Sequence, residues 1–520
     1  MSRNILLSPI VLVACVASGT FLSQPLHAEL KLPAIVGDNM VLQRDLALPI
    51  WGWADPGQSV SVEIAGQKVE GKADDKGRWE VKLSPLATSA KPQSMTIKAG
   101  EENRTLSNIL VGEVWICSGQ SNMQWPLNSA YDADLEKLTA KLPSLRLISV
   151  PQVGTQEIQN NFDGQWAEAS PETVGDFSAV GYFFGRQLLE SLDIPIGLID
   201  DAWGGSAAEA WVRRDLLEKD GRFADYLAQW KNTEATYDHE AAMANWKTAV
   251  EKAKAEKKPL PRQPQNPLTG QHRPGNLYAG VLHPTIGYGI RGVIWYQGET
   301  NASRAANYAE LFPFMIEHWR QEWKQGGFPF YWVQLADFMA ELAQPGESSW
   351  AELRESQTKT LALPNTGQAV IYDVGEGRDI HPRDKRTVGN RLARIALARD
   401  YGIAVPYQSP QYEKMEKKGN KILLTFKDVG GGLYAFDVNE PKGFAIAGAD
   451  KIWHWASGTI VGANQVEVWS DAVADPVAVR YAWADNPIAN LRSRDNLPVV
   501  PFRTDDWPLT TAPAKAEEKK

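Results

Sequence analysis

The stretch Val114-Trp115-Ile116-Cys117-Ser118-Gly119-Gln120-Ser121-Asn122-Met123 decides how the middle of this chain folds. Its four apolar residues, 114–117, predict a short buried strand, and the following glycine predicts a turn with Ser121 at its tip. In open α/β folds, residues that follow the strands lie at the carboxyl edge of the sheet, where active sites are found. A serine in such a turn is either a nucleophile or the N-cap of a helix. This stretch alone leaves both interpretations open.

The first 28 residues have the layout of a secretory signal peptide. A basic start at Arg3 precedes an apolar stretch at 5–16, and small residues predict cleavage after Ala28. The apolar stretch is too short for a membrane span. The residues before Cys15 also resemble a lipoprotein processing site, but the apolar stretch continues past that cysteine. We therefore expect a periplasmic or secreted protein that is neither inserted in the membrane nor anchored through Cys15.

The composition narrows the range of partners. The formal net charge of −9 argues against nucleic acid as a ligand. Without the leader, Cys117 is the one remaining cysteine, so no intrachain disulfide is possible, and we interpret Cys117 as a small buried hydrophobe. The 20 tryptophans are interpreted mainly as core residues, although such rings are also common on carbohydrate-binding surfaces. The oligomeric state cannot be read from the sequence.

Three zones of different pattern follow the leader. Residues 29–108 alternate apolar and polar residues and predict a β-sandwich, with strand candidates at 48–53, 59–64, 79–83 and 95–98. Residues 403–510 predict a second, C-terminal β domain, with strand candidates at 421–426, 465–469 and 477–481. The charge run at 515–520 predicts a disordered tail, which we place at 511–520.

The zone between them, 109–402, alternates strands with amphipathic helices. Strands are predicted at 114–117, 145–150, 196–199, 292–295, 330–335 and 369–372, and helices at 180–191, 308–324, 349–361 and 385–400. Such alternation predicts an α/β fold with a mainly parallel sheet covered on both faces. Residues 215–274 are interpreted as an insertion that either borders the active cleft or forms a surface excursion.

One histidine is placed to act on Ser121. His381 follows the strand predicted at 369–372 and precedes a helix, so it belongs to the same carboxyl edge. A histidine there can take the serine proton, and a carboxylate can orient its ring. Asp379 is the preferred carboxylate, with Asp373 and Asp384 as substitutes. No other histidine or aspartate cluster suggests a metal, so neither a metal nor an organic cofactor is expected.

Two further strand ends carry groups suited to an oxyanion hole. Gly204 and Gly205 follow the strand predicted at 196–199, and glycines let backbone N–H groups approach a substrate oxygen. Gln297 and Asn301 follow the strand predicted at 292–295 and can donate side-chain amides, while Glu299 can orient a neighbour.

Four of these sequence segments resemble those of a known family. The segments 116–125, 202–206, 293–302 and 379–382 resemble, in this order, the sequence blocks of the SGNH hydrolases. Segments 36–43 and 501–505 also resemble the sialate O-acetylesterase-like carbohydrate esterases within that superfamily. The resemblance covers nearly the whole chain after the leader and implies a three-layer α/β/α, flavodoxin-like core between two β domains.

The resemblance also implies roles for these residues. Ser121 would be the nucleophile and His381 the base, with the backbone N–H groups of Ser121 and of Gly204 or Gly205 in the oxyanion hole. The family usually places an asparagine as the third donor, where this chain has Gln297, which we favour over Asn301. The usual Asp-x-x-His spacing is shortened here to Asp379-Ile380-His381, so a Ser–His dyad remains an alternative to a triad. Asn122, Glu299 and Asn301 are expected to support the site.

The expected function is removal of O-acetyl groups from carbohydrate. The expected substrate is an O-acetylated sugar such as acetylated sialic acid, and the alternative is an acetylated plant polysaccharide such as xylan or xyloglucan. An arginine at the cleft would favour an acidic sugar, and Arg354 and Arg383 are the candidates. A non-catalytic carbohydrate-binding protein is the remaining alternative.

Overall fold

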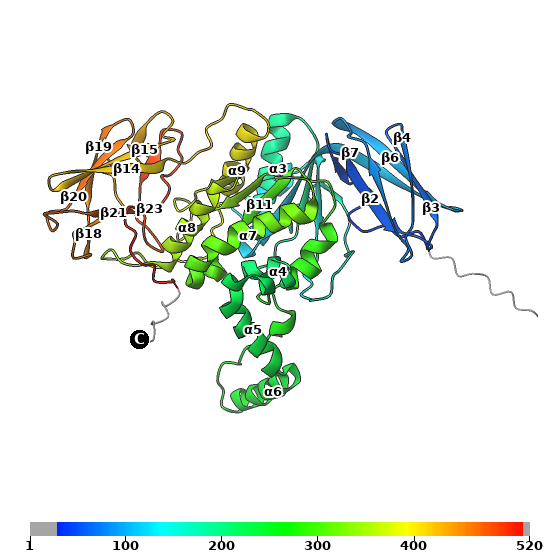
Figure 1. Ribbon diagram of the computed structural model, residues 1–520, viewed down its shortest axis with the longest axis horizontal. Helices are drawn as coiled ribbons and strands as arrows, with labels where there is room; N and C mark the ends of the chain where they lie inside the picture. The colour runs from blue at the N-terminus through cyan, green and yellow to red at the C-terminus, as the bar shows by residue number, and fades with distance from the viewer. Residues whose placement is uncertain (1–28, 513–520) are drawn as a thin grey trace, which may run out of the picture.

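The computed structural model describes residues 29–512, and three regions lie side by side along its long axis (Figure 1). An N-terminal β region and a C-terminal β region flank a central region of sheet and helices. The predicted signal peptide, with its cleavage site at Ala28 and the alternative at Cys15, lies outside the described residues. In the described part of the chain, no helix is long and apolar enough to cross a membrane.

The centre of the molecule is a mainly parallel sheet. Its strands run in the order β13-β12-β11-β7-β10-β8-β9, and the β8–β9 pairing is antiparallel. The bounds are β7 Glu102–Gly119, β8 Leu142–Ser149, β9 Ala167–Ala169, β10 Ile196–Asp200, β11 Gly292–Tyr296, β12 Phe330–Val333 and β13 Thr366–Ala369. Strand β7 lies between β10 and β11, so the three sequence blocks that follow these strands meet at one edge.

Helices cover both faces of this sheet, which confirms the expected α/β core. The helices of the described residues are α1 Ser121–Gln124, α2 Ala133–Thr139, α3 Ala179–Leu192, α4 Arg214–Lys219, α5 Ala224–Thr236, α6 His239–Ala255, α7 Ala305–Trp323, α8 Ser349–Lys359 and α9 Lys385–Arg399, of which α5 and α6 lie away from the sheet. Successive residues of a strand point to opposite faces. Accordingly, Trp115 and Cys117 are buried in the core shared with α3 and α9, and Ile116 in the core shared with α7 and α8. Cys117 is free and buried, as predicted.

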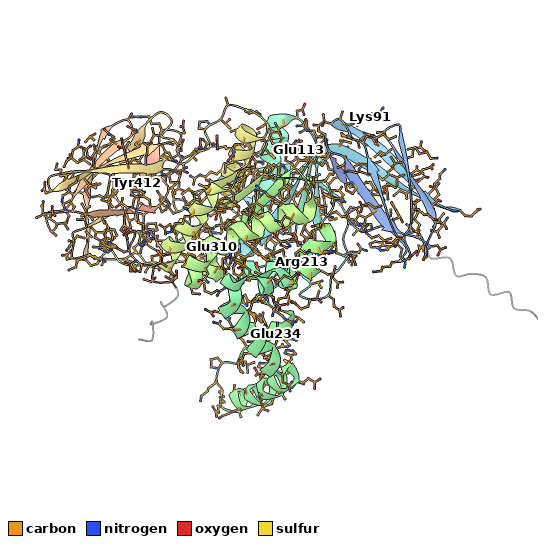
Figure 2. The ribbon with its side chains drawn as sticks, viewed as in Figure 1. Lys91, Glu113, Arg213, Glu234, Glu310 and Tyr412 are labelled. Atoms are coloured by element: carbon orange, nitrogen blue, oxygen red, sulfur yellow. The ribbon has the colours of Figure 1, made fainter. Side chains whose placement is uncertain are left out.

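The N-terminal β region shares its longest strand with the central sheet. Its other strands are β1 Val41–Gln43, β2 Leu48–Trp53, β3 Ser59–Ile64, β4 Gln67–Lys72, β5 Arg78–Leu83 and β6 Ser89–Ala99. The predicted boundary at 108/109 falls inside β7, which pairs with β6 and β1 at one end and with β10 and β11 at the other. Glu113 lies where β7 passes from one region to the other (Figure 2).

One predicted strand of the central sheet is displaced. The ladder of β13 ends at Ala369, whereas the strand was predicted at 369–372. The apolar residues Val370 and Tyr372 are buried, but they pack in the core of the C-terminal β region. The predicted bounds were wrong because the apolar run continues past the strand: Ala369 and Ile371 lie in the central core, whereas Val370 and Tyr372 are buried by the neighbouring domain.

The C-terminal β region contains β14 Gln411–Lys418, β15 Lys421–Lys427, β16 Leu433–Ala435, β17 Phe444–Ala447, β18 Trp453–Trp455, β19 Ser457–Gly462, β20 Gln465–Trp469, β21 Ala478–Tyr481, β22 Leu491–Ser493 and β23 Phe502–Arg503. The chain then returns to the central region, where Thr510 and Thr511 donate backbone and side-chain hydrogen bonds to Glu352 on α8. The predicted tail at 511–520 therefore begins too early, because Thr511 is held by this contact.

The predicted insertion at 215–274 is largely helical. Helices α5 and α6 project away from the central region in Figure 1. A Glu234 carboxylate joins Arg214 and Arg273 at the base of this projection, with contacts of 3.1 and 2.9 Å.

Candidate active site

Ser121 stands at the first position of α1, directly after the central strand β7. Gly119 has φ +135°, and a Cβ at this residue would lie 2.2 Å from the Tyr296 carbonyl oxygen. Only glycine fits a turn that passes so close to the next strand. The Gln120 N–H donates to the same carbonyl at 2.9 Å, which fixes the turn. Gln120 is the N-cap residue, so Ser121 does not serve as the cap.

His381 lies within hydrogen-bond distance of Ser121. Its Nε2 is 2.8 Å from the serine Oγ, across 260 residues of sequence. The imidazole stacks on the Trp125 ring with centroids 4.7 Å apart and planes 15° apart. Burial lowers the pKa of His381, and the charge of Lys385 lowers it further against the opposing effect of Asp379. The ring is therefore held in place and kept in the form that can accept a proton.

Asp379 holds the histidine loop more firmly than it holds the imidazole. Its Oδ1 accepts the backbone N–H of His381 at 2.9 Å, but lies 3.7 Å from Nδ1. A contact of 3.7 Å is too long for a hydrogen bond. The two alternative carboxylates do not orient the imidazole. Asp373 pairs with Arg391 at 2.6 Å, and the Asp384 side chain accepts the Thr387 N–H as the N-cap of α9. The geometry is that of a Ser–His pair with an aspartate at longer range.

Gly204 and Gly205 approach the nucleophile from the end of β10. A Cβ at Gly204 would lie 3.3 Å from the Ser121 Cβ, and Gly205 has φ +70°. The Gly204 N–H donates to Gln124 Oε1 at 2.7 Å. This N–H lies beside the serine and is occupied by Gln124 in the structure, so a substrate oxygen must replace that acceptor to receive it.

Gln297 and Asn301 do not supply an oxyanion donor in this structure. The Gln297 side chain is fully buried, and its Nε2 donates to the Ser206 carbonyl at 3.0 Å and to Asn301 Oδ1 at 2.7 Å. Asn301 Nδ2 donates to Glu209 at 3.0 Å. An amide nitrogen carries two hydrogens, so Gln297 has none left for an oxyanion. This corrects the predicted donor: both side chains tie the 204–208 loop to the end of β11.

Beneath the Ser–His pair, Asn122 joins three segments of the chain. Its Nδ2 donates to Glu299 Oε1 at 2.7 Å and to the Ile380 carbonyl at 2.9 Å, and its Oδ1 accepts from Lys385 Nζ at 2.5 Å. Burial lowers the pKa of Lys385 to about 7, against the opposing charge of Glu299. Burial raises the pKa of Glu299, although Asn122 and Lys385 act against this. Asn122 and Glu299 are therefore support residues, as the sequence suggested.

An open cavity of about 520 Å³ lies beside the Ser–His pair. The residues lining it come from the ends of β7, β8 and β10 and from the loops before α3 and α9, and are Ser121, Gln124, Trp125, Pro126, Ser149, Val150, Gln152, Asp176, Asp200, Ala202 and His381. This volume is within the range of sites that bind small molecules. The cavity therefore has room for a substituent or sugar unit next to the serine.

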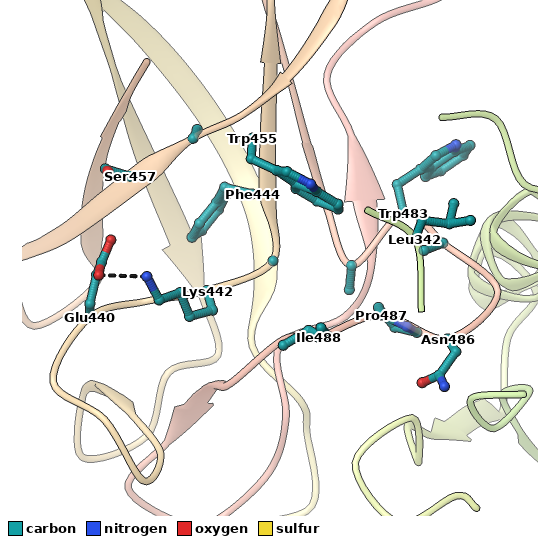
Figure 3. Close-up of a pocket in the computed structure, with 14 residues that line it drawn as sticks. Leu342, Glu440, Lys442, Phe444, Trp455, Ser457, Trp483, Asn486, Pro487 and Ile488 are labelled. Atoms are coloured by element: carbon teal, nitrogen blue, oxygen red, sulfur yellow. Dashed lines mark hydrogen bonds and ion pairs between the residues drawn. The ribbon is translucent and has the colours of Figure 1, made fainter. Parts of the chain in front are cut away.

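A second cavity of about 350 Å³ lies against the C-terminal β region (Figure 3). Trp455, Phe444 and Trp483 line it together with an ion pair between Glu440 and Lys442. Its lining contains neither a histidine nor a nucleophile–base pair. The cavity beside Ser121 is therefore the candidate active site.

Comparisons with known proteins identify the family of this chain. A family model described as carbohydrate esterase, sialic acid-specific acetylesterase, matches residues 276–398. The sialate O-acetylesterase of Mus musculus is 30% identical over 522 residues, covering 91% of this chain and 94% of that protein. The Homo sapiens enzyme is 31% identical, with 76% of each chain covered. The chain belongs to the sialate O-acetylesterase-like carbohydrate esterases.

A solved structure agrees with this family. A carbohydrate acetylesterase from Xanthomonas citri is 39% identical to the chain, covers 92% of it and 100% of its own length, and superposes with a TM-score of 0.78. The protein is thus a carboxylic ester hydrolase of the carbohydrate acetylesterase type.

Several residues of this esterase escaped the sequence analysis. Gln124 and Trp125 stood inside the nucleophile block, but neither had been given a role. Lys385 is the first residue of α9, where the helix dipole disfavours a cation. That unfavourable position was the available signal that Lys385 has a special environment. Asp200, at the end of the strand before the two glycines, had not been given a role either, yet it lines the cavity.

The two arginines considered for an acidic substrate do not line the cavity. Arg354 is fully buried and donates to four backbone carbonyls, including Ala484 at 2.6 Å and Leu335 at 2.9 Å, so it joins the central and C-terminal regions. Arg383 is half-exposed, pairs with Glu376 and lies over the Tyr131 ring.

Proposed function

We propose that this chain is an exported serine esterase of the SGNH type that removes O-acetyl groups from carbohydrate. The observation that carries the proposal is the 2.8 Å contact between Ser121 Oγ and His381 Nε2 on the wall of an open cavity. Nucleophile and base within hydrogen-bond reach are the signature of covalent ester hydrolysis. Export rests on the leader sequence that ends at Ala28.

In the first half of the reaction, His381 Nε2 accepts the proton of Ser121 as Oγ attacks the acetyl carbonyl carbon. The carbonyl π electrons move to oxygen, which becomes an oxyanion held by the backbone N–H groups of Ser121 and Gly204. For this, the substrate oxygen replaces Gln124 Oε1 as the acceptor of the Gly204 N–H. The tetrahedral intermediate collapses, the C–O bond to the sugar breaks, and the sugar oxygen takes the proton from His381.

In the second half, water hydrolyses the acetyl-serine. His381 accepts a proton from the water as its oxygen attacks the acetyl carbon, and the same N–H groups hold the second oxyanion. Collapse releases acetate and returns the proton to Ser121 Oγ. Asp379 acts by fixing the loop that carries His381, through its bond to the histidine N–H.

The proposal is tested by acetate release from O-acetylated sialic acid and from acetylated xylan or xyloglucan, with a simple aryl acetate alongside. Ser121→Ala is expected to lose at least about a thousandfold in kcat, because both halves of the reaction need Oγ. Ser129→Ala is the matched control, because Ser129 is exposed and close in sequence, and its hydrogen bonds with Pro126 and Trp125 are made by its backbone, which the substitution keeps. Retained activity in Ser121→Ala would remove Ser121 as the nucleophile. A parent protein inert toward every ester would favour a binding role.

A further inference from the structure

The cavity beside Ser121 carries negative charge on its wall. Two of its lining residues are carboxylic acids, Asp176 and Asp200, and among the residues that line it there is no lysine or arginine. Its other polar groups are the uncharged side chains of Ser121, Gln124, Ser149 and Gln152, together with His381. A carboxylate substrate finds no opposite charge on this wall.

The cations near the histidine block are held away from the cavity. Lys385 is buried and donates to Asn122 Oδ1 at 2.5 Å. Arg383 lies 3.2 Å from Glu376, and Arg386 is paired with Glu136. The two guanidinium groups are thus paired with carboxylates outside the cavity lining, and the Lys385 ammonium is bound by an amide that does not line the cavity.

Asp200 is placed to contact a sugar. It ends β10, is 8% exposed, and its Oδ1 accepts the Ala202 N–H at 3.2 Å. Burial raises the pKa of Asp200 to about 7, against hydrogen bonds from Ala202 and Ser178. Its carboxyl group can donate to a sugar hydroxyl when protonated and accept from one when ionised. Asp176 is exposed and held by Asn128 Nδ2 at 2.9 Å.

We infer that this cavity selects neutral O-acetylated sugars over anionic ones, because Asp176 and Asp200 face the substrate without a compensating cation. The inference rests on the esterase function proposed above and concerns its substrate class. A carboxylate in the cavity repels a carboxylate on the substrate, and this repulsion lowers the affinity for an anionic sugar relative to a neutral one. The relatives named sialate O-acetylesterase are named for an acid sugar, so this chain is expected to differ from them in selectivity.

The test compares two substrates that differ in charge alone: an O-acetylated sialic acid and its carboxamide analogue. Acetate release is measured at pH 8, where Asp200 is mainly ionised, at low and high salt. The parent is expected to show about a tenfold higher kcat/KM for the carboxamide, equivalent to about 1.4 kcal/mol. High salt is expected to reduce this ratio, because screening weakens the repulsion.

Asp176→Asn and Asp200→Asn are each expected to lower the carboxamide-to-acid ratio. Asp471→Asn is the matched control, because this exposed aspartate lies in the C-terminal β region and its loss removes the same charge far along the chain. Asp176 is exposed, so its variant keeps the test valid if the buried Asp200 variant fails to fold. Equal rates on both substrates, or a faster rate on the acid, would overturn the inference. No acetate from either sugar or from an aryl acetate would remove the esterase proposal itself, and the inference with it.

Discussion

Buried charged groups lie beside β7 at two places, at Glu113 within the strand and at its carboxyl end, and they are matched to different extents. Toward the N-terminal region, the Glu113 side chain has no exposed surface and lies 2.7 Å from Arg291 and 2.5 Å from Arg44. Gln43 donates to the same carboxylate at 2.9 Å. Burial alone would raise the pKa of Glu113, but the hydrogen bonds and charge of Arg291, with Gln43 and Arg44, lower it.

At the carboxyl end, the charged groups around Ser121 are incompletely matched. Burial raises the pKa of Asp200 to about 7 and lowers that of Lys385 to about 7. One carboxylate oxygen of Glu299 has no hydrogen-bond partner among the described residues. Shifted pKa values of this kind gather at functional sites, whereas saturated ion pairs serve folding. The same strand therefore carries a structural ion pair in its interior and borders the chemical site at its carboxyl end.

The largest effect is expected at Glu113, the structural ion pair in the interior of β7. Glu113→Gln leaves Arg44 and Arg291 without their carboxylate, so the free energy of unfolding at pH 7 should fall by about 3 kcal/mol, roughly a hundredfold in the folding equilibrium. Because the pKa of Glu113 is lowered on folding, this stabilisation is present above its ordinary pKa of 4.5 and is lost as the pH falls further. The deficit should therefore shrink in acid.

Urea unfolding at pH 7 and in acid measures this effect. Glu70→Gln is the control, because that exposed pair with Lys68 should contribute little. An equal loss in both variants would contradict the assignment of Glu113 as the structural anchor.

A smaller effect is expected from Asp379. Replacing a triad aspartate that is hydrogen-bonded to Nδ1 lowers kcat by about 10⁴. Here the Nδ1 contact is 3.7 Å, so Asp379→Asn, which keeps an acceptor for the His381 N–H, should cost no more than about tenfold in kcat. Steady-state kinetics on an acetylated sugar decide this. A loss near 10⁴ would show that the aspartate closes on the imidazole during the reaction.

The smallest change at neutral pH is expected from Lys385→Met. The charge of Lys385 is the second cause, after burial, of the lowered pKa of His381. Without that charge the pKa of His381 should rise, so the base is protonated at higher pH and the acidic limb of the rate profile moves upward. Activity should fall more below pH 6 than at pH 8.

A pH–rate profile of kcat/KM against the parent tests this prediction. Lys359→Met on α8 is the control, because this lysine pairs with Glu355 at an exposed position. A uniform loss across the pH range would mean that Lys385 supports the fold of the loop and does not act through charge.

The sequence predicted which edge of the central sheet carries the active site, because the positions of strand ends follow from local apolar patterns. Apolar runs gave β10, β11 and the helices α3, α7, α8 and α9 nearly to the residue, and parallel pairing then brings Ser121, Gly204 and His381 together. It could not give the direction of a side chain. Gln297 stands at the predicted edge, yet its amide faces Ser206 and Asn301 because those partners come from other loops.

The sequence also did not show which apolar residues of one region are buried by another region. The shift of β13 arose because the C-terminal β region covers Val370 and Tyr372. The boundary at 108/109 failed to mark a break because one strand continues through both regions. Both cases depend on packing between segments that no local pattern records.

Thr510 and Thr511 bind Glu352, so the C-terminal β region is attached to the central region twice. One attachment is the chain that leads into it from α9, and the other is the segment that follows its last strand. A domain attached at one point can rotate freely about that point, whereas one attached at two points has a much smaller range of motion. A single cut by a protease would not free this region, and a pulling force applied at its far end would be shared between two attachments.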